Sequence, residues 1–139
     1  MSEDAGPGPQ IALRQVGAIR DGVAEYWNVE WEVENRGAEP IGIAAARLPH
    51  GQFKSEEIRF QPANVLPAGR SSRFHVSVDC HEPSGLVTEN AFVILDVIWR
   101  AQPWRVFSRV RVVVDSDGTP LAITESITTQ KIGFSGVSS

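Results

Sequence analysis

The stretch Tyr26–Glu34 reads Tyr-Trp-Asn-Val-Glu-Trp-Glu-Val-Glu. Its tryptophans and valines alternate strictly with asparagine and glutamate until Asn35-Arg36-Gly37 ends the pattern. Successive side chains of a β-strand point to opposite faces. The alternation therefore predicts a strand with the Trp27 row in the interior and the glutamates in water.

Similar runs recur over 74–80, 91–100 and 104–114, each bordered by glycine, proline or a polar cluster. Further short strands are predicted over 11–19, 41–48 and 56–60. No convincing amphipathic helix separates them. The sequence thus predicts an all-β fold, an immunoglobulin-like antiparallel β-sandwich of about seven to eight strands, in preference to a small barrel.

The chain of 139 residues suits a single domain. Residues 1–9 are polar and rich in glycine and proline, which predicts a flexible N-terminal lead-in. The sandwich domain is expected over 10–115. Residues 116–139 are expected to form a C-terminal hairpin or tail that packs on the sandwich or is mobile.

Composition excludes several classes of protein. A net charge of −4 and a pI of about 5.3 argue against a general nucleic-acid binder, which needs a basic surface. The single cysteine, Cys80, excludes an intramolecular disulfide framework. The N-terminal sequence lacks the basic start and apolar segment of a signal peptide or membrane anchor, so we expect a soluble, cytoplasmic protein with no membrane partner.

Four short motifs resemble the bacterial immunoglobulin-like and fibronectin-III-like modules of the CARDB type. They are Trp27-x-Val29-x-Trp31-x-Val33, then Asn35-x-Gly37, then Leu66-x-x-Gly69, and finally Phe74-x-Val76. The resemblance covers roughly residues 10–115. It implies a binding or spacer module of the kind usually found on exported proteins.

The stretch Ala91–Arg100 is apolar on both faces. The Val93 row occupies one face, and Phe92, Ile94 and Ile98 lie on the other with only two polar residues. By contrast, the faces that carry Glu30 and His75 are polar. One sheet is therefore expected to have an outer surface that is apolar at its centre, and an apolar surface of this kind needs a cover.

Two covers are available. Apolar residues after the Asp117-Gly118 turn could add a strand to the sheet or fold across it; they are Leu121, Ile123, Ile127, Ile132 and Phe134. Alternatively, the surface is an interface with a protein partner or with a second copy in a homodimer.

The same surface is expected to carry a row of arginines. Arg105, Arg109 and Arg111 alternate with the apolar face of the predicted strand 104–114. Guanidinium groups in such a row can bind carboxylates or phosphates of a partner. The alternative is that they pair with Asp96 and with acidic residues of neighbouring strands.

The sequence provides little support for catalysis or metal binding. Asp79-Cys80-His81 combines three ligand types, but neighbouring strand residues point to opposite faces and no second cluster follows at metal-site spacing. Cys80 continues an inward row, which predicts a buried, inert thiol. Without a nucleophile elbow, a phosphate-binding glycine loop or a dinucleotide motif, we expect no enzyme activity, no cofactor and no metal.

Aromatic residues keep a second function open. Trp27, Trp31 and Trp99 follow inward rows and are expected in the core. Trp104 and Tyr26 stand at strand ends, where an exposed ring beside amide or carboxylate side chains would suit a sugar.

The sequence favours a non-enzymatic protein-interaction or assembly module. Its binding residues are predicted on one outer face, namely Phe92, Ile94, Ile98, Arg105, Arg109 and Arg111. A carbohydrate-binding β-sandwich module is the alternative, and a small-ligand-binding β-barrel is the third hypothesis.

Overall fold

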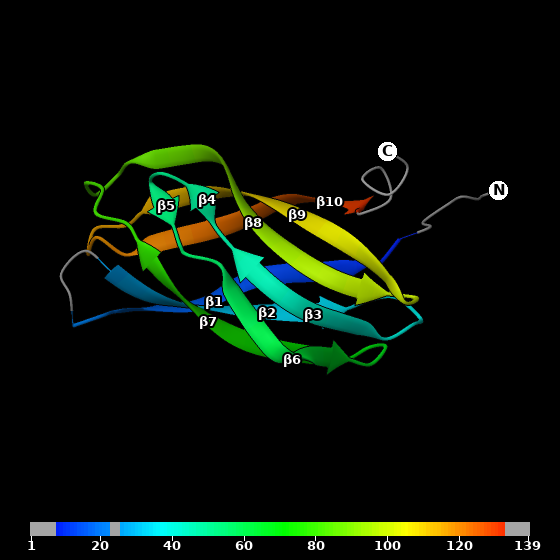
Figure 1. Ribbon diagram of the computed structural model, residues 1–139. Helices are drawn as coiled ribbons and strands as arrows, with labels where there is room; N and C mark the ends of the chain where they lie inside the picture. Colours follow the sequence, from blue (N-terminus) through cyan, green and yellow to red (C-terminus); the bar gives the residue numbers. More distant parts are fainter. Residues whose placement is uncertain (1–7, 23–25, 133–139) are drawn as a thin grey trace, which may run out of the picture.

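The computed structural model describes residues 8–22 and 26–132, which form two five-stranded antiparallel sheets packed face to face (Figure 1). The first sheet has the order β1 (Ile11–Arg20), β2 (Tyr26–Asn35), β7 (Ser71–Asp79), β5 (Phe53–Lys54), β4 (Pro49–His50). The second has the order β10 (Pro120–Lys131), β9 (Gln102–Val114), β8 (Val87–Trp99), β3 (Ile41–Arg47), β6 (Ile58–Leu66).

The predicted all-β, sandwich-like architecture is confirmed. The described residues form ten strands, rather than the seven to eight expected, and the two-residue strands β4 and β5 account for the difference. These residues contain no helix, and therefore none long enough to cross a membrane.

The alternating stretch became β2, the strand between β1 and β7. Trp27, Val29, Trp31 and Val33 are buried, as the pattern predicts. Trp31 is fully buried and meets Phe53 edge to face, with ring centroids 6.3 Å apart. The core therefore lies between the two sheets and includes residues from the short strand β5.

Asn35 ties the end of β2 to two turns. Its Nδ2 donates hydrogen bonds to the backbone oxygens of Glu39 at 2.8 Å and Leu66 at 2.9 Å, and its Oδ1 accepts one from the Gly37 N–H at 2.9 Å. Its backbone oxygen also accepts a bond from the Gly69 N–H. The motifs Asn35-x-Gly37 and Leu66-x-x-Gly69 therefore meet around one buried amide, although they lie far apart in the sequence.

The region after Asp115 adds a strand to the second sheet. β10 pairs antiparallel with β9 along its whole length, and it does not fold across the outer face of the sheet. Ala122 and Ile127 pack against the core, whereas Leu121 and Ile123 are exposed. Phe134, which was considered for the cover, lies outside the described residues.

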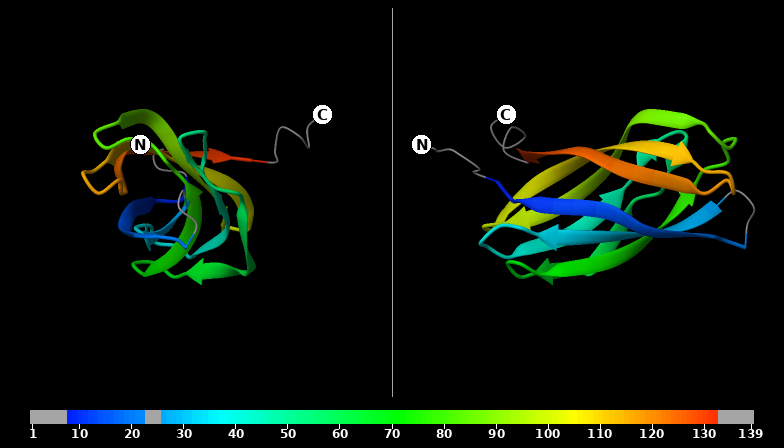
Figure 2. Two further views of the ribbon diagram at one scale, coloured as in Figure 1. Left: turned by 90° about the vertical axis from the view of Figure 1, so that its left-hand side faces the viewer. Right: turned by 180° about the vertical axis from the view of Figure 1, so that it is seen from behind.

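β10 also closes one side of the sandwich against β1 (Figure 2). The Gln15 side-chain amide donates to the Pro120 oxygen at 3.0 Å and accepts from the Ala122 N–H at 2.7 Å. Thr124 Oγ1 donates to the Leu13 oxygen at 2.8 Å. Because Gln15 satisfies one backbone oxygen and one backbone N–H, its amide substitutes for a residue of a neighbouring strand.

The end of the predicted lead-in packs against the sandwich. Gly8 and Pro9 are buried, and residues 1–7 lie outside the described range. A Cβ on Gly8 would lie 2.8 Å from the Trp104 ring, so the close approach requires glycine at this position.

Two buried serines differ in whether their hydroxyl has a partner. Ser55 Oγ accepts a hydrogen bond from the Leu48 N–H at 3.0 Å, whereas Ser108 Oγ has no partner within the described residues. An unpartnered buried hydroxyl lowers stability.

We expect Ser108→Ala to raise the free energy of unfolding by about 1 kcal/mol and Ser55→Ala to lower it by about 1–2 kcal/mol. Urea denaturation checks both signs, and a loss of stability in Ser108→Ala would contradict this account.

Candidate interaction surface

The outer face of the second sheet carries all six predicted binding residues. Along β8 the Val93 row points into the core, and Phe92, Ile94 and Ile98 lie on the opposite side. Their exposure differs. Ile98 is 43% exposed, but Ile94 is only 8% exposed, although it is not part of the central core cluster. In the sheet register, Ile94 lies between Phe107 of β9 and Arg47 of β3.

The arginine row of β9 is engaged with side chains of the same face. Arg105 Nε lies 3.0 Å from Asp96 Oδ1, and Arg111 Nε lies 3.7 Å from Glu125 Oε2. Arg109 instead donates to the neutral oxygens of Asn90 and Ser126, both at 3.3 Å. The expected alternative, internal pairing with Asp96 and a neighbouring strand, thus applies to two of the three arginines.

Two cations of this face retain unneutralised charge. Neither Arg109 nor Arg47 has a carboxylate within ion-pair distance among residues 8–22 and 26–132. Both side chains are partly exposed. At the centre of the face, the buried Ile94 therefore lies among partly buried neighbours that include the arginines.

One end of the face is apolar across β9, β8, β3 and β6 and at the residue that follows β10. Ile98 pairs with Pro103 of β9 and with Gly42 of β3, and Gly42 pairs with Val65 of β6. The Ile132 N–H, just after β10, bonds the Pro103 oxygen at 3.0 Å. We call Ile132, Pro103, Ile98, Gly42 and Val65 the apolar row.

A hollow of about 430 Å³ lies over the β6–β3–β8 part of the apolar row. Val65 is 64% exposed at its rim. A Cβ on Gly42 would stand 3.8 Å from the Cβ atoms of both Ala63 and Ile98, so any side chain at this position would fill part of the hollow. The sequence pattern could not identify this site, because strand register alone brings the row together.

A second apolar corner lies toward the other end of β8. Val87 pairs with Val113, which pairs with Leu121. Val87, Leu121 and Ile123 are each between 43% and 46% exposed. The centre of the face, where the arginines lie, is therefore flanked by apolar residues at both ends.

The outer face of the first sheet has a different character. Glu32 pairs with Arg14 at 2.7 Å and lies 3.8 Å from Arg73, while Glu30 lies 3.6 Å from His75. Charged and polar side chains of neighbouring strands thus pair with one another in water. This pattern is typical of a solvated surface.

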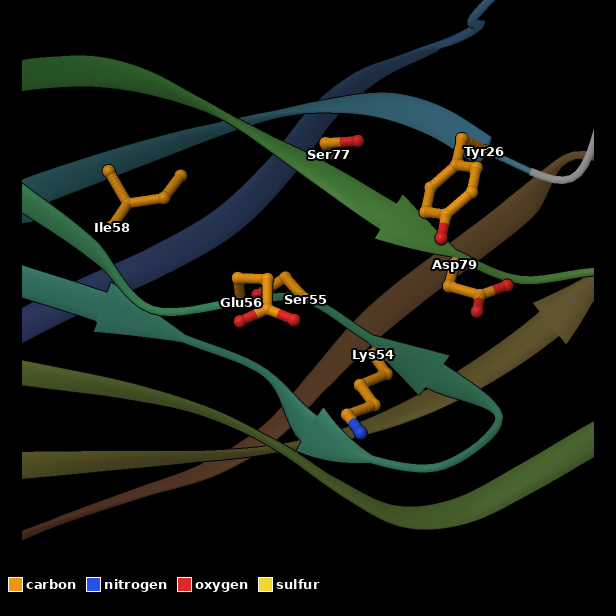
Figure 3. Close-up of a pocket in the computed structure, with 7 residues that line it drawn as sticks. All are labelled: Tyr26, Lys54, Ser55, Glu56, Ile58, Ser77 and Asp79. Atoms are coloured by element: carbon orange, nitrogen blue, oxygen red, sulfur yellow. The ribbon is translucent and has the colours of Figure 1, made fainter. Parts of the chain in front are cut away.

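A polar hollow of about 230 Å³ lies at one end of the first sheet (Figure 3). Tyr26 comes from β2 and Ser77 and Asp79 from β7, opposite the segment 54–58. Tyr26 is 38% exposed. By contrast, Trp27, Trp31 and Trp99 are buried, and Trp104 is partly buried and packs edge-on against Trp99 at 5.6 Å.

The Asp79-Cys80-His81 cluster combines a buried thiol with a partly exposed contact between a carboxylate and an imidazole. Cys80 is buried, and that burial raises the pKa of its thiol, which keeps the sulfur protonated and poorly nucleophilic. Asp79 Oδ1 lies 3.2 Å from His81 Nδ1. Nowhere in the described residues do three His, Cys, Asp or Glu side chains come together as metal ligands would.

Comparisons with known proteins add no evidence about function. No protein-family model matches the chain, and no curated protein matches its sequence. The chemistry of the two outer faces is therefore the basis on which a function can be inferred.

Proposed function

We propose that this protein is a non-enzymatic interaction or assembly module that binds another protein chain through the outer face of its second sheet. The apolar row carries this proposal, because Ile98 and Val65 are exposed in it and its other members are only partly buried, while the outer face of the first sheet carries charged pairs such as Arg14–Glu32. Exposed contiguous apolar surface of this kind is typical of protein interfaces.

We infer that the sandwich is of the immunoglobulin type. The strand order supports this, since β1, β2 and β7 oppose β9, β8 and β3, with β6 beside β3. Immunoglobulin-like sandwiches place strands A, B and E in one sheet and strands C, F and G in the other. β1, β2 and β7 correspond to the first set, and β3, β8 and β9 correspond to the second. β10 is then an additional strand on the free side of β9.

The partner is expected to combine an apolar centre with acidic groups. Complete burial of Ile98 and Val65 would contribute about 1.5–3 kcal/mol for each side chain. Arg47 and Arg109 would orient carboxylates of the partner, since they have none of their own. A second copy fits best when the contact is centred on the apolar row, because full overlap of the two faces would oppose arginines to arginines.

A photo-crosslinking experiment tests the proposal. A benzoylphenylalanine at position 65 is expected to give one discrete product in cells that make the protein naturally, while the same group at position 73, on the first sheet, gives none. Val65 and Arg73 are both well exposed, which makes the pair a matched control. A product of twice the chain mass identifies a second copy, and another mass identifies a different partner. No product from position 65, or equal products from both positions, would refute the proposal.

Ile98→Arg provides an independent check. We expect it to reduce the yield of the position-65 product, and any self-association seen by light scattering, at least about tenfold, a loss of about 1.4 kcal/mol or more. Ile19→Arg, a matched change on the first sheet at a residue that is 73% exposed, should leave both unchanged. Because Ile98 is itself 43% exposed, the substituted chain is expected to fold.

A further inference from the structure

The hollow beside Tyr26 shares no lining residue with the apolar row, since it lies between strands β2, β5 and β7 of the first sheet and the first residue of β6. The Tyr26 ring extends toward Asp79 on one side, and Ser55, Glu56 and Ile58 stand across from it (Figure 3). Tyr26 is the most exposed of the phenylalanine, tryptophan and tyrosine residues that the structure describes. The hollow therefore combines a ring face, an aliphatic side chain and several polar groups.

Four polar groups around this hollow lack partners within the described chain, whereas Asp79 contacts His81 and Ser55 accepts a bond from the Leu48 N–H. Among the described residues, no hydrogen bond or ion pair engages the Tyr26 hydroxyl, the Lys54 ammonium, the Glu56 carboxylate or the Ser77 hydroxyl. Elsewhere on the same face, carboxylates pair across strands, as Glu32 does with Arg14. Both donors and acceptors are thus free to bind a ligand.

The charges restrict the class of ligand. Glu56 and Asp79 would repel a phosphate or carboxylate, and Lys54 would repel a cation. A purely apolar ligand would cover the polar groups without satisfying them. A neutral polyhydroxylated ring avoids all three costs, since its C–H face packs on an aromatic ring and its hydroxyls both donate and accept.

We propose that the hollow beside Tyr26 is a saccharide-binding site for one neutral sugar ring. The Tyr26 ring stacks on the sugar, Glu56 and Asp79 accept hydrogen bonds from its hydroxyls, and Lys54 and Ser77 donate to its oxygens. The hollow has a volume of about 230 Å³, which is smaller than the roughly 300–1,000 Å³ of pockets for drug-sized ligands and therefore suits a single ring. A single ring bound at such an open site is expected to have a dissociation constant of about 1 mM.

Amide NMR titrations with glucose, galactose, mannose and N-acetylglucosamine test this proposal. At least one sugar is expected to give saturable shifts that include the amides of Tyr26, Glu56 and Ser77. Tyr26→Ala should weaken that binding at least about tenfold, whereas Tyr26→Phe, which keeps the ring, should stay within about threefold of the native chain. Ile19→Ala, another exposed residue of the first sheet, is the matched control and should have no effect.

Three results would overturn the assignment. One is the absence of saturable shifts with all four sugars in a chain whose spectrum is that of a folded protein. Another is unchanged affinity in Tyr26→Ala. The last is that sodium acetate or inorganic phosphate produces the same shifts, which would show that charge alone accounts for binding. None of these results bears on the interaction face of the second sheet.

Discussion

Asn35→Ala is expected to lower the free energy of unfolding by about 3–5 kcal/mol. The substitution leaves the backbone oxygens of Glu39 and Leu66 and the N–H of Gly37 without the partner that Asn35 provides, at a fully buried position. Each unsatisfied buried group costs about 1–3 kcal/mol. Chemical denaturation followed by the fluorescence of the buried tryptophans measures the loss, and a change below about 1 kcal/mol would contradict the role assigned to Asn35.

Two controls separate the hydrogen bonds of Asn35 from other effects. Asn28→Ala removes an exposed amide whose one side-chain hydrogen bond within the described residues is to the His75 ring, at 3.0 Å, and should cost less than about 0.5 kcal/mol. Asn35→Asp keeps the shape and the acceptor but replaces the donor by a carboxylate facing two carbonyl oxygens. That environment would raise the pKa of the introduced carboxyl, so the loss relative to the native chain should be largest at neutral pH and decrease as the pH falls through the raised pKa.

Alternating patterns predicted the interior of the sandwich well. Period-two patterns correctly assigned the inward rows of β2, β7 and β8, because burial on one face requires a strict alternation. The motifs Asn35-x-Gly37 and Leu66-x-x-Gly69 correctly predicted the turns that follow β2 and β6. Gly69 has a positive φ of 78°, a conformation that favours glycine.

Strand ends and edges were harder to predict. The predicted strand 91–100 begins too late, because β8 starts at Val87 and already includes Glu89 and Asn90. The register shifts there, between Thr88 and Ala91, and Asn90 has a φ of 59°. A proline inside a central strand would remove a hydrogen bond to a neighbouring strand. β6 continues past Pro62 because it is an edge strand. Local patterns do not reveal which strands lie at an edge.

The candidate sites depend on information that no single stretch of sequence contains. Ile94 and Ile98 have the same outward pattern, yet their exposures of 8% and 43% differ because Phe107 and Arg47 flank the first, while Gly42 leaves the second open. Likewise, the apolar row and the Tyr26 hollow each join residues from several strands. Pairing register is a property of the whole fold, so sequence reasoning found the face but not its accessible part.

Truncation after Asp115 is expected to have the largest effect on the fold, a loss of more than about 4 kcal/mol in the free energy of unfolding or a failure to fold as a monomer. Without β10, β9 becomes a bare edge strand of thirteen residues, and the core loses the cover of Ala122 and Ile127. Circular dichroism and light scattering measure the outcome. A truncated chain with native stability would show that β10 is not part of the structural unit.

A matched pair of point substitutions assigns this effect to the inward face of β10. Ile127→Asp places a charge against the core and should lower the free energy of unfolding by about 2–4 kcal/mol. Thr128→Asp changes the next residue, which is exposed, and should lower it by less than about 0.5 kcal/mol.

Association of the truncated chain would have two sources, the bare β9 edge and the apolar row. Ile98→Arg distinguishes them, because it disrupts only the row: association that persists in the doubly altered chain comes from the edge, and association that disappears comes from the proposed interaction face.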